Sequence, residues 1–109
     1  MNVQAMTLEH YEALATAHPT LVIIGRPSCS DCTQWHEVLR DWNPPSEPIF
    51  SAFSLNLDDA VGQHFCEEHP WTSSIQHIPF NVLFRDGVPV EQWTGGSLRR
   101  MEEKIANVV

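Results

Sequence analysis

The chain has 109 residues, of which 42% are hydrophobic and 18% are charged, and its formal net charge at pH 7 is -8. This length fits one domain, residues 1–109, and the composition predicts a folded globule rather than a disordered chain. With only six Lys and Arg residues, the acidic balance argues against binding to nucleic acid or to an anionic membrane surface.

Two elements are predicted before residue 20. Residues 3–6 read as a short strand, and Thr7 can cap a helix over residues 8–17, which Pro19 ends. The apolar residues of this helix recur at three- and four-residue spacing. They define its expected inner face: Leu8, Tyr11, Leu14 and Ala15.

The next two elements flank a pair of cysteines. Residues 20–25 are continuously apolar and β-branched, which is typical of a strand covered on both faces. Residues 33–42 form a predicted helix, and the prolines of residues 43–48 indicate a loop. The expected inner side of the helix carries Trp35, Val38, Leu39 and Trp42.

A strand over residues 49–58 and a helix over residues 59–69 follow. Gly62 weakens this helix, because glycine loses more backbone entropy than other residues when it is ordered. The side chains expected to turn inward are Val61, Phe65 and Cys66.

A hairpin and a last helix complete the chain. Asp86-Gly87 stands between two apolar alternations and predicts a tight hairpin turn. Pro89 places the second hairpin strand at an edge of the sheet, because proline cannot donate to a ladder. Ser97 can cap a helix over residues 98–109. Its expected inner stripe is Leu98, Met101, Ile105 and Val108.

The predicted elements alternate between strand and helix and then end in a hairpin and a helix. This order indicates an α/β fold, in which crossovers build parallel strands and the hairpin adds antiparallel ones. We therefore expect a central mixed sheet of about five strands flanked by about four helices.

The cysteines are Cys29, Cys32 and Cys66, an odd number that does not suit a secreted disulfide scaffold. The N-terminal segment shows no signal peptide, and the longest clean apolar run, residues 21–24, is far too short to span a membrane. We expect a cytoplasmic monomer without a membrane anchor. In that compartment a close pair of cysteines is catalytic or metal-binding rather than structural.

Cys29 falls at the end of a predicted strand and Cys32 in the first turn of the next helix. Free N–H groups and the helix dipole stabilise a thiolate there, so the thiol becomes a nucleophile near neutral pH. The spacing also lets the two sulfurs form a small-ring disulfide. Cys29, the more exposed, is predicted to attack a substrate disulfide, and Cys32 to resolve the mixed disulfide.

A Cys-x-x-Cys between a buried strand and a helix resembles the thioredoxin family. The segment "QHIPFNVLFRDGVPVEQWTGG" is similar to the part of that family that carries an Ile-cis-Pro bond, a hairpin and a glycine facing the dithiol. Ile78 and Pro79 match the Ile-cis-Pro pair, Asp86-Gly87 the hairpin, and Gly95 the glycine. The resemblance extends over essentially the whole chain and implies a thioredoxin fold.

The resemblance also implies roles for residues outside the dithiol. Ile78 and cis-Pro79 should dock an extended substrate peptide, with Gly95 and Gly96 permitting close approach and Trp93 supplying apolar surface at the rim. The substrates would be proteins that contain disulfides. No bound cofactor or metal is implied, because a separate reductase would supply the electrons.

The sequence departs from the family at positions that handle protons. Ile23 stands where a buried aspartate is usual, Ser54 where a lysine accompanies it, and Glu37 where a proline kinks the helix. A different class of protein therefore stays open, an adaptor module with the same fold whose dithiol is vestigial or regulatory. Catalytic turnover of a disulfide would distinguish the two.

Asp31, beside Cys32, is a candidate for proton transfer or for tuning the thiol pKa. Its carboxylate would disfavour a Cys29 thiolate, and Arg26 could offset that effect. The competing interpretation is a favourable charge in the first helical turn.

Two further interpretations involve histidines. Cys29 and Cys32 could bind zinc together with His64, Cys66 or His69, although the spacing is poor for a closed zinc site. Otherwise Cys66 is expected to be a small core residue. His36, one turn after Cys32, is either a solvent-facing helix residue or a proton acceptor that faces the dithiol.

Overall fold

The computed structural model describes residues 1–15, 18–46 and 50–108. Strands and helices alternate in the predicted order, with one additional 3-10 helix. The elements are β1 (Val3–Ala5), α1 (Leu8–Ala13), β2 (Thr20–Gly25), α2 (Ser30–Arg40), β3 (Ser51–Asn56), α3 (Ala60–Glu68), η1 (Pro70–Ser74), β4 (Phe80–Arg85), β5 (Val88–Thr94) and α4 (Leu98–Ala106). The predictions that fall on residues 16–17, 47–49 and 109 lie outside the described residues.

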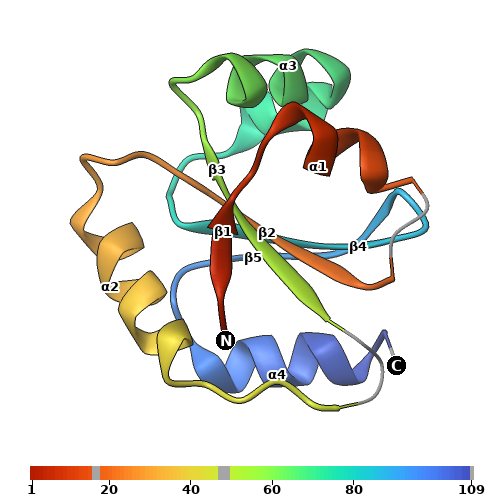
Figure 1. Ribbon diagram of the computed structural model, residues 1–109. Helices are drawn as coiled ribbons and strands as arrows, with labels where there is room; N and C mark the ends of the chain where they lie inside the picture. Colours follow the sequence, from red (N-terminus) through yellow and green to blue (C-terminus); the bar gives the residue numbers. More distant parts are fainter. Residues whose placement is uncertain (16–17, 47–49, 109) are drawn as a thin grey trace.

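The five strands form one mixed sheet in the order β1-β3-β2-β4-β5. β3 pairs in parallel with both β1 and β2, whereas β4 pairs antiparallel with β2 and β5. Figure 1 shows α1 and α3 on one face of this sheet and α2 and α4 on the other. The predicted fold class, a mixed sheet of five strands flanked by four helices, is confirmed.

Two hydrophobic cores lie on the two faces of the sheet, and β2 contributes to both. Leu21 and Ile23 point into the core beneath α2 and α4, while Val22 and Ile24 point into the core beneath α1 and α3. All six residues of β2 are buried, as the continuous apolar run predicts. The strand that leads to the cysteines is therefore held on both sides.

Side-chain caps begin the helices. Thr7 caps α1 and Ser97 caps α4, each accepting a backbone N–H three residues later, as predicted. Asp59 caps α3 in the same way. In the stripe predicted for the last helix, Met101 and Ile105 are buried.

The hairpin between β4 and β5 has the predicted two-residue turn. Asp86 and Gly87 both have positive φ, 53° and 78°, which is the backbone of the turn that suits a two-residue hairpin. β5 is an edge strand, and the register of the ladder shifts where Phe84 faces Pro89. The prediction that Pro89 marks an irregular edge strand is confirmed.

Some predicted core positions are wrong. Leu8 is 46% exposed, because Met6 just before α1 fills the core instead. Ala15 is exposed, since α1 ends at Ala13. Val38 is 39% exposed, because the buried residues of α2 follow one line along the helix and Val38 lies beside it. α2 also begins at Ser30, earlier than the apolar pattern indicates.

In the described part of the chain, no helix has both the length and the apolar character needed to cross a membrane.

Candidate active site

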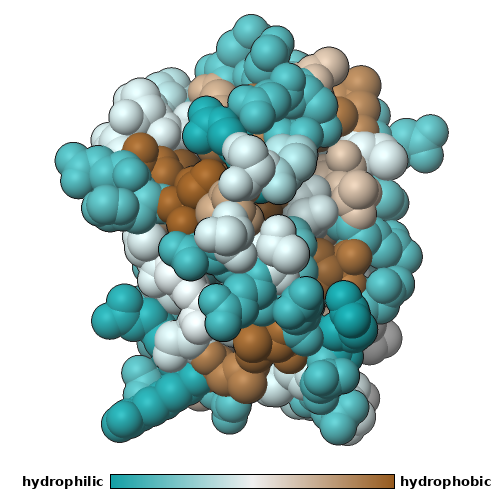
Figure 2. All heavy atoms as spheres, turned by 90° about the vertical axis from the view of Figure 1, so that its left-hand side faces the viewer, coloured by the Kyte–Doolittle hydropathy of each residue, from teal (hydrophilic) through white to brown (hydrophobic). Residues whose placement is uncertain are grey.

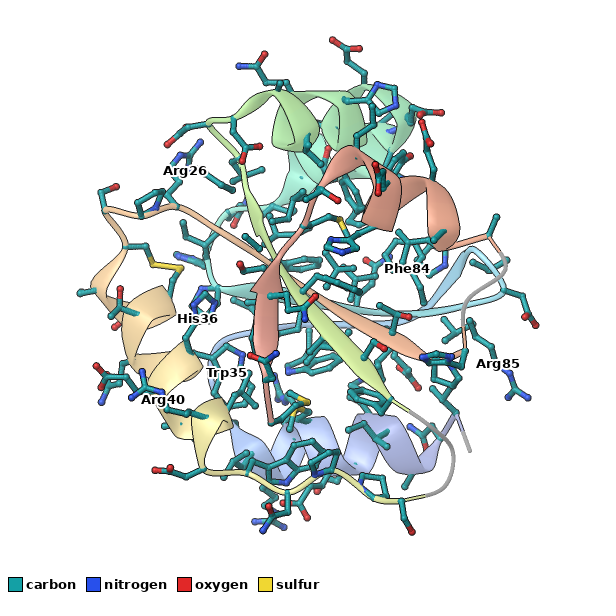
Figure 3. All side chains as sticks on the ribbon, in the orientation of Figure 1. Arg26, Trp35, His36, Arg40, Phe84 and Arg85 are labelled. Carbon is teal, nitrogen blue, oxygen red and sulfur yellow. A yellow bond between two sulfur atoms is a disulfide. The ribbon has the colours of Figure 1, made fainter. Side chains whose placement is uncertain are left out.

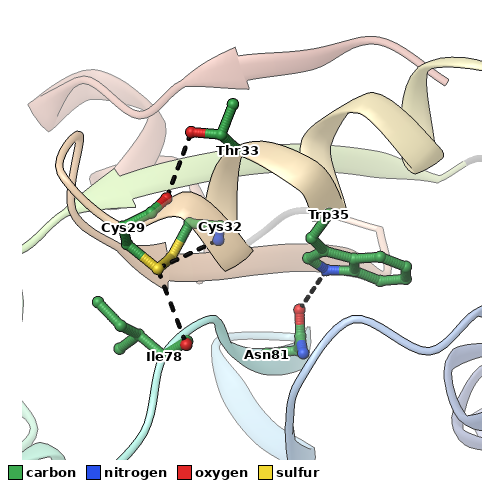
Figure 4. Close-up of a disulfide and its surroundings, with 6 residues drawn as sticks. All are labelled: Cys29, Cys32, Thr33, Trp35, Ile78 and Asn81. Atoms are coloured by element: carbon green, nitrogen blue, oxygen red, sulfur yellow. Dashed lines mark hydrogen bonds between the residues drawn. A yellow bond between two sulfur atoms is a disulfide. The ribbon is translucent and has the colours of Figure 1, made fainter.

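Cys29 and Cys32 form a disulfide at the N-terminus of α2. Cys29 is the N-cap residue, and its Sγ accepts the backbone N–H of Cys32 at 3.1 Å (Figure 4). The hydroxyl of Thr33 donates to the carbonyl oxygen of Cys29 at 3.3 Å. Cys29 is half-buried and Cys32 is 3% exposed, so the Cys29 sulfur is the more accessible of the two.

Gly25, the last residue of β2, lies directly against Cys32. A Cβ atom at this position would lie 2.7 Å from the Cys32 Sγ, closer than real Cβ contacts come. Only glycine therefore lets Cys32 pack onto the end of the strand. Sequence reasoning missed this role, because a glycine at the end of a strand does not reveal which residue approaches it.

The Ile78–Pro79 peptide bond is cis, as the resemblance predicts, and it directly precedes β4. The Cys29 Sγ lies 3.8 Å from the carbonyl oxygen of Ile78. The carbonyl of Pro79 accepts the N–H of Gly95 at 2.8 Å. The segment before β4 and the segment after β5 therefore meet beside the disulfide.

The two glycines after β5 occupy positions that a side chain would disturb. Gly95 has a φ of 95°, a conformation that favours glycine. A Cβ on Gly96 would lie 3.0 Å from the Trp35 ring. Both glycines line a cavity of about 400 Å³ together with Ile78 and Pro79, so the structure brings these four predicted site residues together.

Asn81 is a buried polar residue that holds these segments in place. It is 0% exposed on β4, and its Oδ1 accepts the Trp35 Nε1–H at 2.9 Å. Its Nδ2 donates to the carbonyl oxygens of Gly95, at 2.8 Å, and Trp93, at 3.3 Å. Asn81 thus links α2 to the turn after β5. The prediction did not include it, although an Asn within an apolar strand pattern is a signal worth following.

The Trp93 side chain does not lie at the rim of the site. It is 4% exposed and packs in the core beneath α2 and α4. The alternation of β5 explains this correction: Trp93 points toward the helices, while its neighbours Gln92 and Thr94 are exposed.

A second, larger cavity of about 790 Å³ adjoins Ile78 on the α3 side. Cys66 lines it and is a half-buried free thiol. The expected core role of Cys66 is therefore wrong. Phe65, one position earlier on α3, turns fully into the core, which leaves Cys66 at the cavity wall.

The charged residues near the disulfide are exposed. Asp31 lies in the first turn of α2 and lines the cavity that contains Gly95 and Gly96. The Nε of Arg26 lies 3.1 Å from Asp58 Oδ1 and forms an ion pair there. The partner of Arg26 is thus Asp58 rather than the carboxylate beside Cys32.

His36 lies on α2, one turn after Cys32, and is half-buried. Both residues line a third cavity, of about 150 Å³, between α2 and the sheet. Burial lowers the pKa of the His36 imidazole below its ordinary value of 6.5. Its Nε2 is buried, and none of the residues that the structure describes makes a hydrogen bond to it. Figure 3 shows the ring pointing from α2 toward the sheet. The expectation of a solvent-facing histidine is therefore wrong.

The zinc alternative needs a third ligand close to the cysteine pair. Among the described residues, no group of three or more His, Cys, Asp or Glu side chains is placed to hold a metal ion. His64 instead forms a surface pair with Glu68 on α3, and His69 Nε2 lies 3.2 Å from the Tyr11 hydroxyl.

The surface around the site is mixed in character. Figure 2, which views the molecule from the α2 side, shows hydrophobic surface in separate patches between hydrophilic side chains. Val38 on α2 is one of the exposed hydrophobic residues, and it lines the cavity beside Pro79.

The sequence matches no protein-family model and no curated protein. Solved structures are similar over almost the whole chain. Oxidised thioredoxin from Plasmodium falciparum has a TM-score of 0.76 at 12% identity, covering 98% of both chains. Malassezia sympodialis thioredoxin has a TM-score of 0.74 at 14% identity, covering 98% of this chain and 93% of its own.

The germline-specific thioredoxin Deadhead of Drosophila melanogaster has a TM-score of 0.74 at 12% identity and covers 99% of this chain and 100% of its own. At such low identity these similarities establish the fold. The chain has the thioredoxin fold, with a Cys29–Cys32 disulfide at the start of α2.

Proposed function

We propose that the protein is a thiol-disulfide oxidoreductase that reduces protein disulfides through a Cys29–Cys32 dithiol–disulfide cycle. The observation that carries the proposal is the position of the disulfide. It lies at a helix N-terminus with one accessible sulfur, 3.8 Å from the carbonyl oxygen of the residue before a cis-proline. A purely structural disulfide would have no need of a partly accessible cysteine or of the cavity beside it.

The cycle begins from the dithiol form. The Cys29 thiolate attacks one sulfur of the substrate disulfide, which breaks the substrate S–S bond and forms a mixed disulfide. The Cys32 thiolate then attacks the Cys29 Sγ, closes the intramolecular disulfide and releases the second substrate sulfur. The substrate gains two electrons and two protons, and the protein loses them.

The substrate would dock against the strand end beside Cys29. Ile78 and Pro79 would present the backbone edge that an extended peptide pairs with, and Gly95 and Gly96 would let it approach closely. The positive φ of Gly95 and the open space at its Cβ position, where no described residue other than its chain neighbours has an atom within 4 Å, support this arrangement. The partners are then proteins with accessible disulfides and a separate reductase that returns electrons. We expect a cytoplasmic monomer.

Reduction of insulin disulfides by dithiothreitol tests the proposal. The wild type should accelerate the precipitation of insulin, and Cys29→Ser should abolish the acceleration because the attacking sulfur is gone. Cys66→Ser is the matched control, which removes a thiol without touching the pair and should behave as wild type. Equal rates for wild type and Cys29→Ser would contradict the proposal.

The alternative, an adaptor with a vestigial or regulatory dithiol, has one observation in its favour. Ile23, 1% exposed, and Ser54 line the cavity behind Cys32, so neither position carries a charged group there. An adaptor would bind its partner equally well after both cysteines are replaced. A Cys32→Ser variant, which traps mixed disulfides, should capture substrates only if the pair reacts.

A further inference from the structure

We infer that His36 accepts the proton of the Cys32 thiol in the resolving step, across the cavity that both side chains line. The inference rests on the proposed function, since it assigns a role within the Cys29–Cys32 cycle. It adds a proton acceptor to the resolving step, because Cys32, which is 3% exposed in the disulfide form, has little contact with bulk solvent.

The helix and the cavity bring the two groups together. Cys32 and His36 are four residues apart on α2, which places them on one face of the helix. The cavity of about 150 Å³ that they share is closed on the sheet side by β2 and β3. Its polar lining includes Ser54 and Asn56 from β3 and Thr33 from α2. This space is large enough for a few water molecules, at about 30 Å³ each.

The Nε2 of His36 is the observation that a structural role does not explain. It is buried, and no atom of the described residues makes a hydrogen bond to it. A buried polar atom without a partner is unfavourable, so each one calls for a reason. In a neutral imidazole one ring nitrogen is an acceptor, and an unpaired acceptor that lines the same cavity as a thiol is suited to proton transfer.

The surroundings keep the imidazole neutral and therefore able to accept. Burial lowers its pKa from 6.5. Arg26 lines the same cavity and is paired with Asp58, and Met1 and Arg40 line the adjoining cavity with His36. Among the described residues that line these two cavities there is no carboxylate that would favour an imidazolium.

The Cys32 S–H proton passes to His36 Nε2, and the Cys32 sulfur attacks Cys29 Sγ in the mixed disulfide. The Cys29–Cys32 bond forms and the bond to the substrate sulfur breaks, so that sulfur leaves as a thiolate. The imidazolium then releases its proton to solvent, and the leaving thiolate takes one up.

Stopped-flow reaction with a coloured nitrophenyl disulfide separates the two steps. Attack by Cys29 releases the first coloured thiolate, and attack by Cys32 releases the second. All proteins should carry Cys66→Ser, so that only the pair reacts. The comparison is between His36 and His36→Gln, with His64→Gln as the matched control. His64 lies on α3 in a surface pair with Glu68, away from the cavity.

His36→Gln should slow the second phase by about thirtyfold at pH 7, because a thiol of ordinary pKa, about 8.5, is only about 3% thiolate at that pH. The first phase should be unchanged. The slow rate should rise about tenfold per pH unit toward the ordinary thiol pKa of about 8.5 and meet the unsubstituted rate above it, where the thiolate forms without help. His64→Gln should leave both phases and both profiles unchanged.

The unsubstituted protein provides a second test that needs no stable variant. Its second phase should be level from neutral pH to about pH 8 and should fall as His36 is protonated, with an inflection below 6.5. A rate that instead rises steadily through this range, or a His36→Gln profile that is lowered equally at every pH, would overturn the inference. A missing second phase in the unsubstituted protein would instead overturn the proposed function.

Discussion

Asn81 shows how one buried polar side chain positions the site. It joins the Trp35 indole on α2 to the carbonyl of Gly95 after β5, so it links the helix that begins at the disulfide to the turn that follows the last strand. In a low-dielectric interior such a network is strong when it is complete and costly when it is broken. The residue therefore fixes the distance between helix and turn.

Asn81→Leu keeps the branched shape of the side chain and removes its three hydrogen bonds. It should lower the free energy of unfolding by about 2–4 kcal/mol, because the Trp35 N–H and the carbonyl oxygens of Trp93 and Gly95 lose this partner. Urea unfolding measures the change. Thr20→Val is the control, since Thr20 is equally buried but makes a single bond, to the His18 carbonyl at 2.8 Å. If Asn81→Leu lowers the free energy of unfolding no more than Thr20→Val does, the hydrogen bonds of Asn81 do not stabilise the fold as we expect.

Gly25→Ala tests the contact beneath Cys32. The added methyl would lie 2.7 Å from a sulfur that the disulfide holds in place, and overpacking of this kind costs about 1–3 kcal/mol. In the dithiol form the free sulfur can rotate away, so the loss should be smaller. Denaturant unfolding of both redox forms, each beside its wild type, measures the difference. An equal loss in the two forms would show that the methyl meets something other than the Cys32 sulfur.

At the scale of the element, the N-cap residues determine where several of the helices begin. Asp59 caps α3 by accepting the Gly62 N–H at 2.8 Å. The capped turn also packs closely against the end of β3, because a Cβ atom on Gly62 would clash with the carbonyl oxygen of Asn56. α3 must therefore start close against the end of β3.

Asp59→Ala should destabilise the protein by about 1 kcal/mol, because the Gly62 N–H group loses its side-chain acceptor. Thermal or urea unfolding gives the value. Glu67→Ala, on the exposed surface of the same helix, is the matched control and should change stability by less than about 0.5 kcal/mol. Equal effects of the two substitutions would mean that the cap contributes nothing.

For the whole molecule, partly buried titratable groups limit the pH range in which the free energy of unfolding is highest. Burial lowers the pKa of His36 and of His69, with the nearby Glu68 partly opposing the shift at His69. Burial and Glu68 raise the pKa of Tyr11 above 10.0. A lowered histidine pKa means that the unfolded chain binds more protons in acid, and a raised tyrosine pKa means that it loses more protons in alkali.

The free energy of unfolding should therefore be highest between about pH 6.5 and pH 10 and should fall outside this range. On the acid side the contribution of the histidines is complete above 6.5 and is lost as pH falls toward their folded pKa values. Urea unfolding at about pH 5 and pH 7 measures the loss. The double variant His36→Gln, His69→Gln should show a smaller loss than the wild type, and an unchanged loss would exclude these two groups as its source.

The order of elements, the strand β2, the hairpin turn and the cysteine pair could be predicted because each depends on neighbours in the chain. Four apolar residues in a row define a strand covered on both faces, and Asp-Gly supplies the positive φ that a two-residue turn needs. The resemblance to thioredoxins added the cis bond at Pro79. These features confirm that local pattern and turn chemistry specify most of this fold.

Only the tertiary structure decided which side chains meet. Trp93 was expected at the rim of the site and lies in the core, whereas Val38 was expected in the core and is exposed. The reason is that packing between elements fixes the register of a strand and the rotation of a helix. Asn81, Gly25 and the cavity shared by Cys32 and His36 depend on residues far apart in the chain. The sequence by itself determined the elements and the close pair of cysteines, since these follow from short-range chemistry. The environment of that pair follows from how the sheet and α2 pack, and no local pattern contains it.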